Sequence, residues 1–228
     1  MSRTTEGPPG LDDRDGHHSF ASLLRSMVPQ RPRFMRGPRI DDGVRSPVIR
    51  TERLVLRPHR LADADAWYAL QSDPRVVEHL SWPLRTRAES FVHLAHRTRH
   101  TRLEQLNDFL ALAVLLDGRL IGDASLHLRS LDHADRRVDV GWVIGPDWQG
   151  RGYAREAAEA MLQLAFERLG AVHCEAHMTW GNAASKALAE RLGFEEAPGH
   201  GEERIMVLTA ERWRASRGHV GGPPSDSH

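Results

Sequence analysis

The feature that most constrains the fold is a glycine-rich turn between an expected strand and an expected helix, within residues 136–158. The residues before the turn predict a strand with one apolar face, formed by Val138, Val140, Trp142 and Ile144. The residues after it predict a helix with an apolar stripe, formed by Ala154, Ala157, Ala158, Met161, Leu162, Ala165 and Phe166. Gly150 and Gly152 let an anion approach the unpaired N–H groups at the positive end of the helix dipole. The turn therefore predicts an anion-binding site that suits a pyrophosphate.

Two common phosphate-binding motifs do not fit this turn. A Walker loop ends in Gly-Lys-Ser/Thr, whereas this chain has Gly152-Tyr153-Ala154 at the equivalent place. A dinucleotide-binding fold has its glycines in the first strand-to-helix turn, with an acidic residue about twenty residues later. Here the glycines come about two-thirds of the way along the chain. Neither class of nucleotide-binding protein is therefore indicated.

The turn does resemble that of the GNAT acetyltransferases, because Gln149, Gly152 and Ala154 match the pattern Q/R-x-x-G-x-G/A. Three further segments resemble the RimJ/RimL branch, whose founding members acetylate the N-termini of ribosomal proteins. They are the TERLVLRP run at 51–58, the SDP break at 72–74 followed by Trp82, and the helix with Asp63 and Asp65 between them. Asn182, Ser185 and the ERLGF run at 190–194 resemble the last motif of the superfamily.

The resemblance implies an α+β fold in α/β/α layers. Its centre would be a mixed, mostly antiparallel sheet of about seven strands flanked by helices, with a splayed strand pair that holds acetyl-CoA. It implies acetyl-CoA as co-substrate, with the pantetheine arm along the strand that ends at Ile144. The cofactor-binding residues implied in this way are Trp142, Val143, Ile144, Gln149, Gly150, Arg151, Gly152, Tyr153, Ala154 and Asn182.

The implied catalytic residues are Asp139 and Ser185. Asp139 stands where branch members commonly have a glutamate, and its shorter side chain favours a water-mediated base; Glu175, His127 or a water chain are alternatives. Histidine needs little change of pKa to accept a proton near neutrality. Ser185 occupies the place of a proposed proton donor to the thiolate. Many members have a tyrosine where this chain has Ala189, which agrees with the branch but leaves the acid open.

These residues predict an N-acetyltransferase that moves an acetyl group to a primary amine by direct attack on the thioester. The amine is a protein N-terminus or a small molecule, and the sequence does not distinguish them. The alternative is an inactive acetyl-CoA-binding sensor or interaction module. It is kept because Ala189 departs from the family pattern and the base is not assigned.

The domain organisation follows from composition. Residues 1–47 are expected to be a flexible extension, with a short helix over 19–28 that either docks or forms only transiently; Met27 or Met35 are alternative starts. Residues 48–214 are expected to form the acetyltransferase domain, and 215–228 a disordered tail. The elements expected between them are strands at 51–58, 171–179 and 204–208, a hairpin of 109–116 and 119–128, and helices at 61–71, 85–106 and after Asn182.

Charge and cysteine content bound the remaining classes. Lys plus Arg and Asp plus Glu both number 31, so no global charge favours nucleic acid or membrane as a partner. The single cysteine, Cys174, fits a core position in a reducing cytoplasm, and a monomer or homodimer is expected. We predict no metal, because two histidine groups lack further ligands: His93 with His96 and His100, and His173 with Glu175 and His177.

Overall fold

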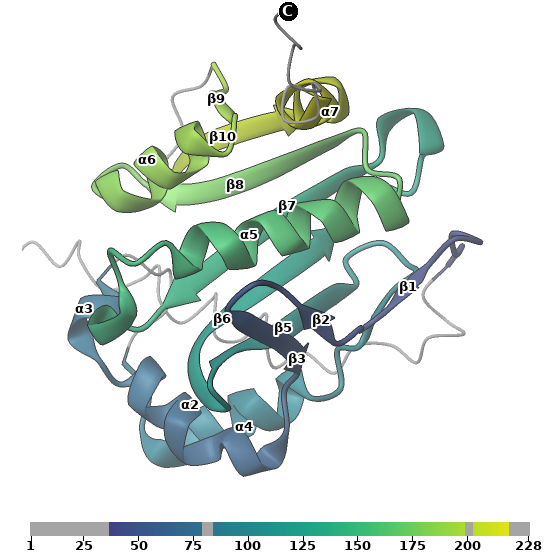
Figure 1. The fold of residues 1–228 in the computed structure, drawn as a ribbon. Helices are drawn as coiled ribbons and strands as arrows, with labels where there is room; N and C mark the ends of the chain where they lie inside the picture. Colours follow the sequence, from purple (N-terminus) through teal and green to yellow (C-terminus); the bar gives the residue numbers. More distant parts are fainter. Residues whose placement is uncertain (1–36, 79–83, 199–202, 219–228) are drawn as a thin grey trace, which may run out of the picture.

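The computed structural model describes residues 37–78, 84–198 and 203–218. Its centre is an eight-stranded sheet in the order β2-β3-β5-β6-β7-β8-β10-β9, and β1 pairs with β4 in a separate ladder (Figure 1). The strands are β1 Val44–Arg45, β2 Ile49–Arg50, β3 Leu54–Pro58, β4 Arg102–Leu103, β5 Phe109–Leu116, β6 Arg119–Leu128, β7 Arg137–Ile144, β8 His173–Thr179, β9 Glu195–Glu196 and β10 Glu203–Thr209. All pairs are antiparallel except β7 with β8, so the mixed, mostly antiparallel sheet is confirmed.

Helices cover both faces of this sheet. The α-helices are α2 Ala64–Gln71, α3 Pro74–Val77, α4 Arg87–Arg97, α5 Tyr153–Gln163, α6 Ala183–Arg191 and α7 Ala210–Gly218. Short 3-10 turns are η2 Leu61–Asp63, η3 His133–Asp135 and η4 Pro146–Trp148, and α5 continues into the π-helical turn η5 Leu164–Arg168. No helix in the described part of the chain is long and apolar enough to cross a membrane.

The alternation of residues in β7 decides which helix packs on which face. Val138 and Val140 are buried in the large core cluster, where Ala157 and Met161 of α5 also lie. Val143 points the other way and packs against the second cluster, which contains Trp67 of α2 and Leu94 of α4. The α5 helix therefore covers one face, and α2 with α4 cover the other (Figure 1).

The expected hairpin is confirmed. Asp117 and Gly118 both have positive φ, at 49° and 79°, which is the backbone that a tight two-residue turn between antiparallel strands requires. The β5 and β6 strands then pair from Phe109 with His127 to Leu116 with Arg119, and one register shift follows Val114. This hairpin supplies two central strands of the sheet.

The β7 and β8 strands form the expected splayed pair. They are hydrogen-bonded in parallel at three positions only, ending with Asp139 opposite Glu175. Beyond that point β7 continues to pair with β6 as far as Ile144, and β8 continues to pair with β10 as far as Thr179. The backbone groups of residues 140–144 that face β8 therefore have no strand partner there, and the sheet opens toward its edge.

The structure departs from the sequence predictions near the ends of the domain. Residues 37–47 were expected to be flexible, yet Ile40 and Val44 are buried and β1 pairs with β4. The helix expected over 85–106 ends at Arg97, because the chain turns there to form β4. Residues 215–218, expected in the tail, belong to α7. The expected helix at 19–28 and Trp82 lie outside the described residues.

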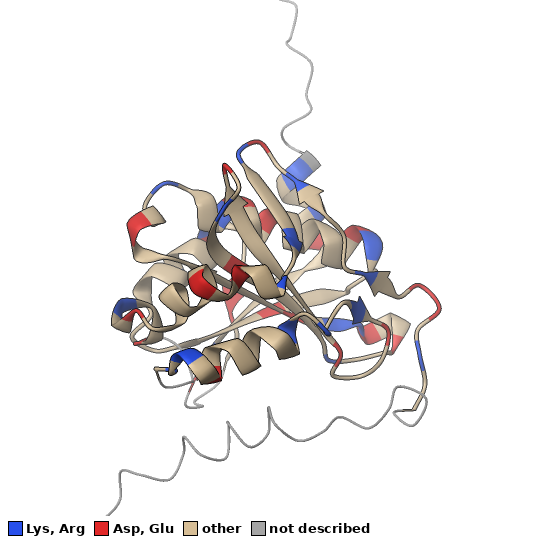
Figure 2. Cartoon of the chain, turned by 90° about the horizontal axis from the view of Figure 1, so that it is seen from below, with Lys and Arg blue, Asp and Glu red and all other residues tan. Residues whose placement is uncertain are grey.

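Charged side chains are spread over the elements. Figure 2 shows Lys and Arg near Asp and Glu on several helices and loops, with the two signs interspersed. This distribution matches the balanced total of 31 basic and 31 acidic residues. Local groups of charge, rather than the overall field, therefore distinguish one part of the surface from another.

Candidate active site

Two hydrogen bonds hold the end of β7 and the turn that leads to α5 in place. After β7 ends at Ile144, the Gly145 N–H donates to the carbonyl of Ile121 over 2.8 Å. The side-chain Nε2 of Gln149 donates to the carbonyl of Ile144 over 2.9 Å. Gln149, an expected cofactor-binding residue, therefore fixes the end of β7 relative to the turn. Its side-chain carbonyl oxygen remains to contact a ligand.

The turn itself presents free backbone donors. Gly150 and Gly152 have φ of 74° and 82°, in the region that favours glycine. No described residue accepts a hydrogen bond from the backbone N–H of Gly150, Arg151 or Gly152, and all three residues are exposed. The N–H groups of the first turn of α5, beginning at Tyr153, also lack partners by helix geometry. A Cβ at Gly150 would meet no atom within 4 Å, so the space beside the turn is open.

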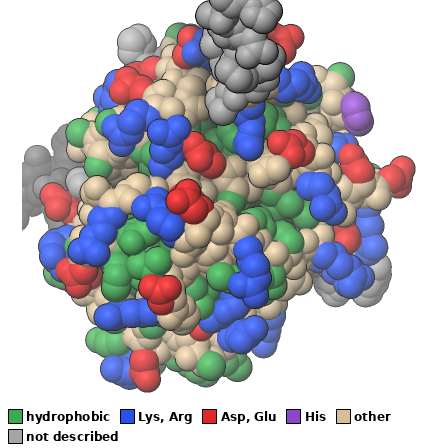
Figure 3. Space-filling model, viewed as in Figure 1, with side chains coloured by type: hydrophobic (Ala, Val, Ile, Leu, Met, Phe, Trp, Pro, Cys, Tyr) green, Lys and Arg blue, Asp and Glu red, His purple; other side chains and the backbone are tan. Residues whose placement is uncertain are grey.

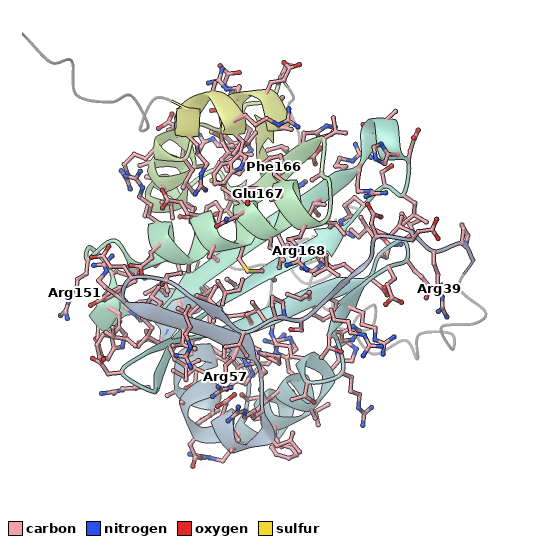
Figure 4. The ribbon with its side chains drawn as sticks, turned by 45° about the vertical axis from the view of Figure 1, so that its right-hand side comes forward. Arg39, Arg57, Arg151, Phe166, Glu167 and Arg168 are labelled. Atoms are coloured by element: carbon pink, nitrogen blue, oxygen red, sulfur yellow. The ribbon has the colours of Figure 1, made fainter. Side chains whose placement is uncertain are left out.

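Arginine side chains surround this turn. The guanidinium groups of Arg119 and Arg151 lie over the Trp148 ring, at 5.1 Å and 5.8 Å from its centroid. Figure 3 shows basic side chains gathered at the end of the molecule where α5 begins. In Figure 4 the Arg151 side chain projects outward from the same end. Cations and unpaired N–H groups at a helix N-terminus together favour binding of a phosphate group.

The two arms of the splay bring the expected cofactor residues to one edge of the sheet. Since β7 and β8 are parallel, their carboxyl ends at Ile144 and Thr179 lie at the same edge. Trp142 and Val143 are half-buried on the β7 arm, and Asn182 follows the end of β8. The turn at 149–154 and the start of α6 therefore flank the opening, while Asp139 lies at its closed end.

Asn182 caps α6. Its Oδ1 accepts a hydrogen bond from the backbone N–H of Ser185 over 3.0 Å, which is the usual N-cap arrangement. The amide NH₂ of Asn182 remains as a donor to a pantetheine arm. Ala189, where many family members have a tyrosine, is buried in the core.

We expect Asn182→Ala to lower the free energy of unfolding by about 1 kcal/mol, because the cap is lost. Chemical denaturation checks this value. Ser216→Ala on α7 is a control, because its hydroxyl donates only to the Trp213 carbonyl within the same helix. A loss of CoA affinity with unchanged stability would contradict the capping role.

Asp139 belongs to a cluster of charged side chains at the closed end of the splay. Its Oδ2 accepts from Nε of Arg129 over 2.6 Å, and its side chain is only 15% exposed. Its Oδ1 lies 3.8 Å from Nε2 of His177, which lies 3.1 Å from Oε2 of Glu175. The expected alternative base Glu175 is thus adjacent to Asp139. The pairing of Asp139 with Arg129, which lies in the loop between β6 and β7, was not predicted from the sequence.

Residues 37–78, 84–198 and 203–218 contain one group of three potential metal ligands, formed by Asp139, Glu175 and His177. Their ligand atoms all lie within 4.8 Å of one another. Ion pairs already engage both carboxylates, with Arg129 at 2.6 Å and Arg137 at 3.8 Å. The expected trio of His93, His96 and His100 is divided: the Nε2 atoms of His96 and His100 are 3.0 Å apart, whereas His93 packs against Trp67.

His127 was an alternative base because histidine ordinarily has a pKa near neutrality, and in this structure it does not. Burial, together with the charges of Arg129 and Arg97, lowers the pKa of His127 to about 3. A group with that pKa holds almost no proton near neutrality and is a weak base. Burial also raises the pKa of the Cys174 thiol, which supports the expected role of Cys174 as a core residue.

A buried charged cluster under α2 and α4 was not anticipated from the sequence. Asp123 of β6 is 3% exposed; its Oδ1 lies 2.8 Å from Nη2 of Arg97 and 3.6 Å from Nε2 of His59. Burial by itself raises the pKa of Asp123, but Arg97 and His59 outweigh it and hold that pKa below its usual value. In the β6–β7 ladder, Asp123 lies opposite Val143, and His127 lies opposite Asp139. Since Val143 and Asp139 are four residues apart on β7, Asp123 and Asp139 lie on the same face of the sheet.

Comparison with known proteins identifies the fold and the family. The structure of a GCN5-related N-acetyltransferase from Brucella melitensis has a TM-score of 0.66 at 21% identity, and the match covers 84% of this chain and 91% of that one. The structure of RimL, a ribosomal L7/L12 α-N-protein acetyltransferase in complex with coenzyme A, has a TM-score of 0.57 at 15% identity, covering 73% and 98% of the two chains.

Sequence relatives agree with the fold. An uncharacterized N-acetyltransferase, p20 of Bacillus licheniformis, is 26% identical over 146 residues, which are 64% of this chain and 81% of that protein. The putative ribosomal N-acetyltransferase YdaF of Bacillus subtilis is 35% identical over 83 residues, which are 36% and 44% of the two chains. Residues 53–195, more than half of the chain, match the family described as acetyltransferase (GNAT) domain. The chain therefore belongs to the GNAT acetyltransferase family and is an acyltransferase similar to the RimJ/RimL type.

Proposed function

We propose that the protein transfers the acetyl group of acetyl-CoA to a primary amine. The observation that carries the proposal is the set of free N–H groups at Gly150, Arg151 and Gly152, which lie at the N-terminus of α5 beside the open arm of β7. The diphosphate of CoA binds these donors together with Tyr153 and Ala154. The pantetheine arm adds to the unpaired backbone of Trp142, Val143 and Ile144, with Asn182 on the opposite arm.

In the proposed reaction the amine nitrogen attacks the thioester carbonyl, which forms a tetrahedral oxyanion. Collapse of this intermediate breaks the C–S bond and releases the CoA thiolate, while the nitrogen loses a proton. Asp139 at the closed end of the splay receives that proton through a water molecule, because its side chain is short and its Oδ2 is already bonded to Arg129. Ser185 donates a proton to the thiolate and regains one from solvent, while Asp139 releases its proton to solvent, so that amine and acetyl-CoA give amide and CoA.

The acceptor that we propose is the N-terminal amine of a protein. This proposal is supported by the names of two similar proteins, the putative ribosomal N-acetyltransferase YdaF and the RimL enzyme, which is described as acting on ribosomal L7/L12. Small primary amines are the alternative acceptors, because the GNAT fold carries out many acetyl transfers.

CoA release in the presence of amines tests the proposal directly. We expect CoA release with at least one class among N-terminal peptides, polyamines, amino acids and aminoglycosides, and the fastest release with peptides. CoA binding without turnover in any class would favour the alternative, a sensor that binds acetyl-CoA without transfer. Failure of CoA to bind would reject both.

Ser185→Ala is expected to lower kcat by about 10- to 100-fold, which is the usual size of a general-acid contribution. CoA affinity should change little, because the Ser185 backbone N–H, rather than its hydroxyl, bonds to Asn182. Steady-state kinetics and calorimetry measure the two effects. An unchanged kcat would remove Ser185 from the mechanism, whereas Ser216→Ala should leave both quantities unchanged.

A further inference from the structure

A residue far away in the sequence reaches the phosphate-binding turn. Arg53 lies just before β3, and its Nη1 donates to the backbone carbonyl of Arg151 over 2.9 Å. Its Nε donates to Oε2 of Glu156, in the first turn of α5, over 2.7 Å. The same guanidinium lies over the Tyr153 ring at 4.7 Å. One side chain thus contacts three residues of the turn and of the helix that follows it.

The contact with the Arg151 carbonyl fixes the direction of an amide. The peptide bond between Arg151 and Gly152 is trans, so its C=O and N–H point in opposite directions. Since Arg53 holds the carbonyl on its own side, the Gly152 N–H points away from Arg53. Glycine adopts many backbone conformations at similar energy, so this peptide plane could rotate if nothing held it. A rotated plane would direct a carbonyl oxygen, rather than an N–H, at an anion.

Glu156 holds the Arg53 guanidinium in position. Its Oε1 accepts from the Thr51 hydroxyl over 2.6 Å and from the Arg53 backbone N–H over 2.8 Å. Burial raises the pKa of Glu156, but the bonds from Thr51 and Arg53 outweigh it and lower that pKa, so the carboxylate stays ionised. The segment before β3 and the first turn of α5 are therefore joined by a set of bonds that spans about a hundred residues of sequence.

We propose that Arg53 is a positioning residue for the cofactor: it holds the Arg151–Gly152 peptide in the orientation that presents the Gly152 N–H to the diphosphate of CoA. This inference rests on the proposed function, because it assumes that CoA binds at the turn. Arg53 acts through the Arg151 carbonyl and Glu156, and its role is distinct from that of a positive charge near a phosphate.

The first test compares two arginines of the same segment. Arg53→Met is expected to raise the dissociation constant for CoA about 10-fold or more, as loss of a charge-assisted hydrogen bond that orients a donor would do. Arg57→Met is the matched control. Arg57 lies on β3 and pairs with Asp63 at 2.7 Å, and it does not contact the turn. Figure 4 shows Arg57 apart from Arg151. The control should change CoA affinity less than twofold; calorimetry gives both values, and thermal unfolding shows that the variants are folded.

The second test uses the direction in which Glu156→Gln changes the affinity for CoA. Glu156→Gln removes a negative charge near the phosphate site, so charge alone would strengthen CoA binding. If Glu156 anchors Arg53, the substitution releases the guanidinium and weakens CoA binding instead. We expect a rise of several-fold in the dissociation constant, in the same direction as Arg53→Met.

Arg53→Lys gives a third arm, and it replaces Arg53→Met if that variant does not fold. Lysine keeps the charge but cannot bond the Glu156 carboxylate and the Arg151 carbonyl in the same fork geometry, so weakened CoA binding is expected. Full affinity in Arg53→Lys, tighter binding in Glu156→Gln, or unchanged affinity in Arg53→Met would each overturn the inference. If the unmodified protein itself failed to bind CoA, the proposed function would fail instead, so the two failures are distinguishable.

Discussion

Gly152→Val is expected to raise the dissociation constant for CoA by about 100-fold or more, which corresponds to about 2.7 kcal/mol. Gly152 has φ of 82°, a conformation that a β-branched residue adopts only with strain. A Cβ at this position would lie 3.2 Å from Nη2 of Arg53, so the substitution also displaces the side chain that orients the turn. The valine methyl groups would occupy the space beside the free N–H groups.

The matched control for this prediction is Gly170→Val, which follows the other end of α5 and its continuation η5. Gly170 also has a positive φ, at 64°, and a Cβ there would lie 3.4 Å from Nη1 of Arg136. The control therefore carries a comparable backbone strain at the opposite end of the helix from the proposed phosphate-binding turn. We expect it to reduce stability while CoA affinity stays within about twofold, as an independent distant site should. Equal CoA affinity in Gly152→Val and the unmodified protein would reject the proposed placement of the diphosphate.

Asp123→Asn is expected to reduce the free energy of unfolding by about 3–5 kcal/mol, because it leaves the buried Arg97 guanidinium without its counter-charge. The pair is buried at 4% and 11% side-chain exposure, and its N–O distance is 2.8 Å. Chemical denaturation at neutral pH measures the loss. Asp65→Asn is the control, because the ion pair of Asp65 with Arg87 is largely exposed, and exposed pairs contribute little.

The effect of Asp123 should depend on pH in a defined direction. The pKa of Asp123 is held below its usual value in the folded protein, so its stabilising contribution is complete above the ordinary aspartate pKa of about 3.9. It is lost as the pH falls through the lower, folded-state pKa. The difference in stability between the unmodified protein and Asp123→Asn should therefore shrink in acid. A constant difference down to low pH would contradict the assignment of a charged Asp123.

Local sequence patterns predicted the regular elements well. The Asp117-Gly118 turn between two apolar runs, and the strand–glycine–helix order around Gly150, each depend on residues a few positions apart, and both are present in the structure. The two-residue strands β1 and β4 were missed because a single buried side chain in each, Val44 and Leu103, shows no periodicity.

The long-range side-chain contacts in and near the site could not be predicted from local sequence patterns. Arg53 and Glu156 meet across 103 positions of sequence, and Asp123 meets Arg97 only because α4 packs over β6. Each of these residues alone is typical of an exposed surface. The low pKa of His127 likewise follows from burial that one sequence does not show. The glycine-rich turn is evident in the sequence, but its support by Arg53 and Glu156 depends on contacts that exist only in the folded chain.

Amide chemical shifts during a CoA titration test the central claim most directly. In a ¹H–¹⁵N correlation spectrum, the N–H signals of Gly150, Arg151, Gly152 and Tyr153 should move most, because these groups are the proposed diphosphate donors. Smaller shifts should follow along Trp142, Val143 and Ile144, where the pantetheine arm is proposed to lie. Unmoved signals of residues 150–153 at saturating CoA, or largest changes on another part of the protein, would contradict binding of the diphosphate at this turn.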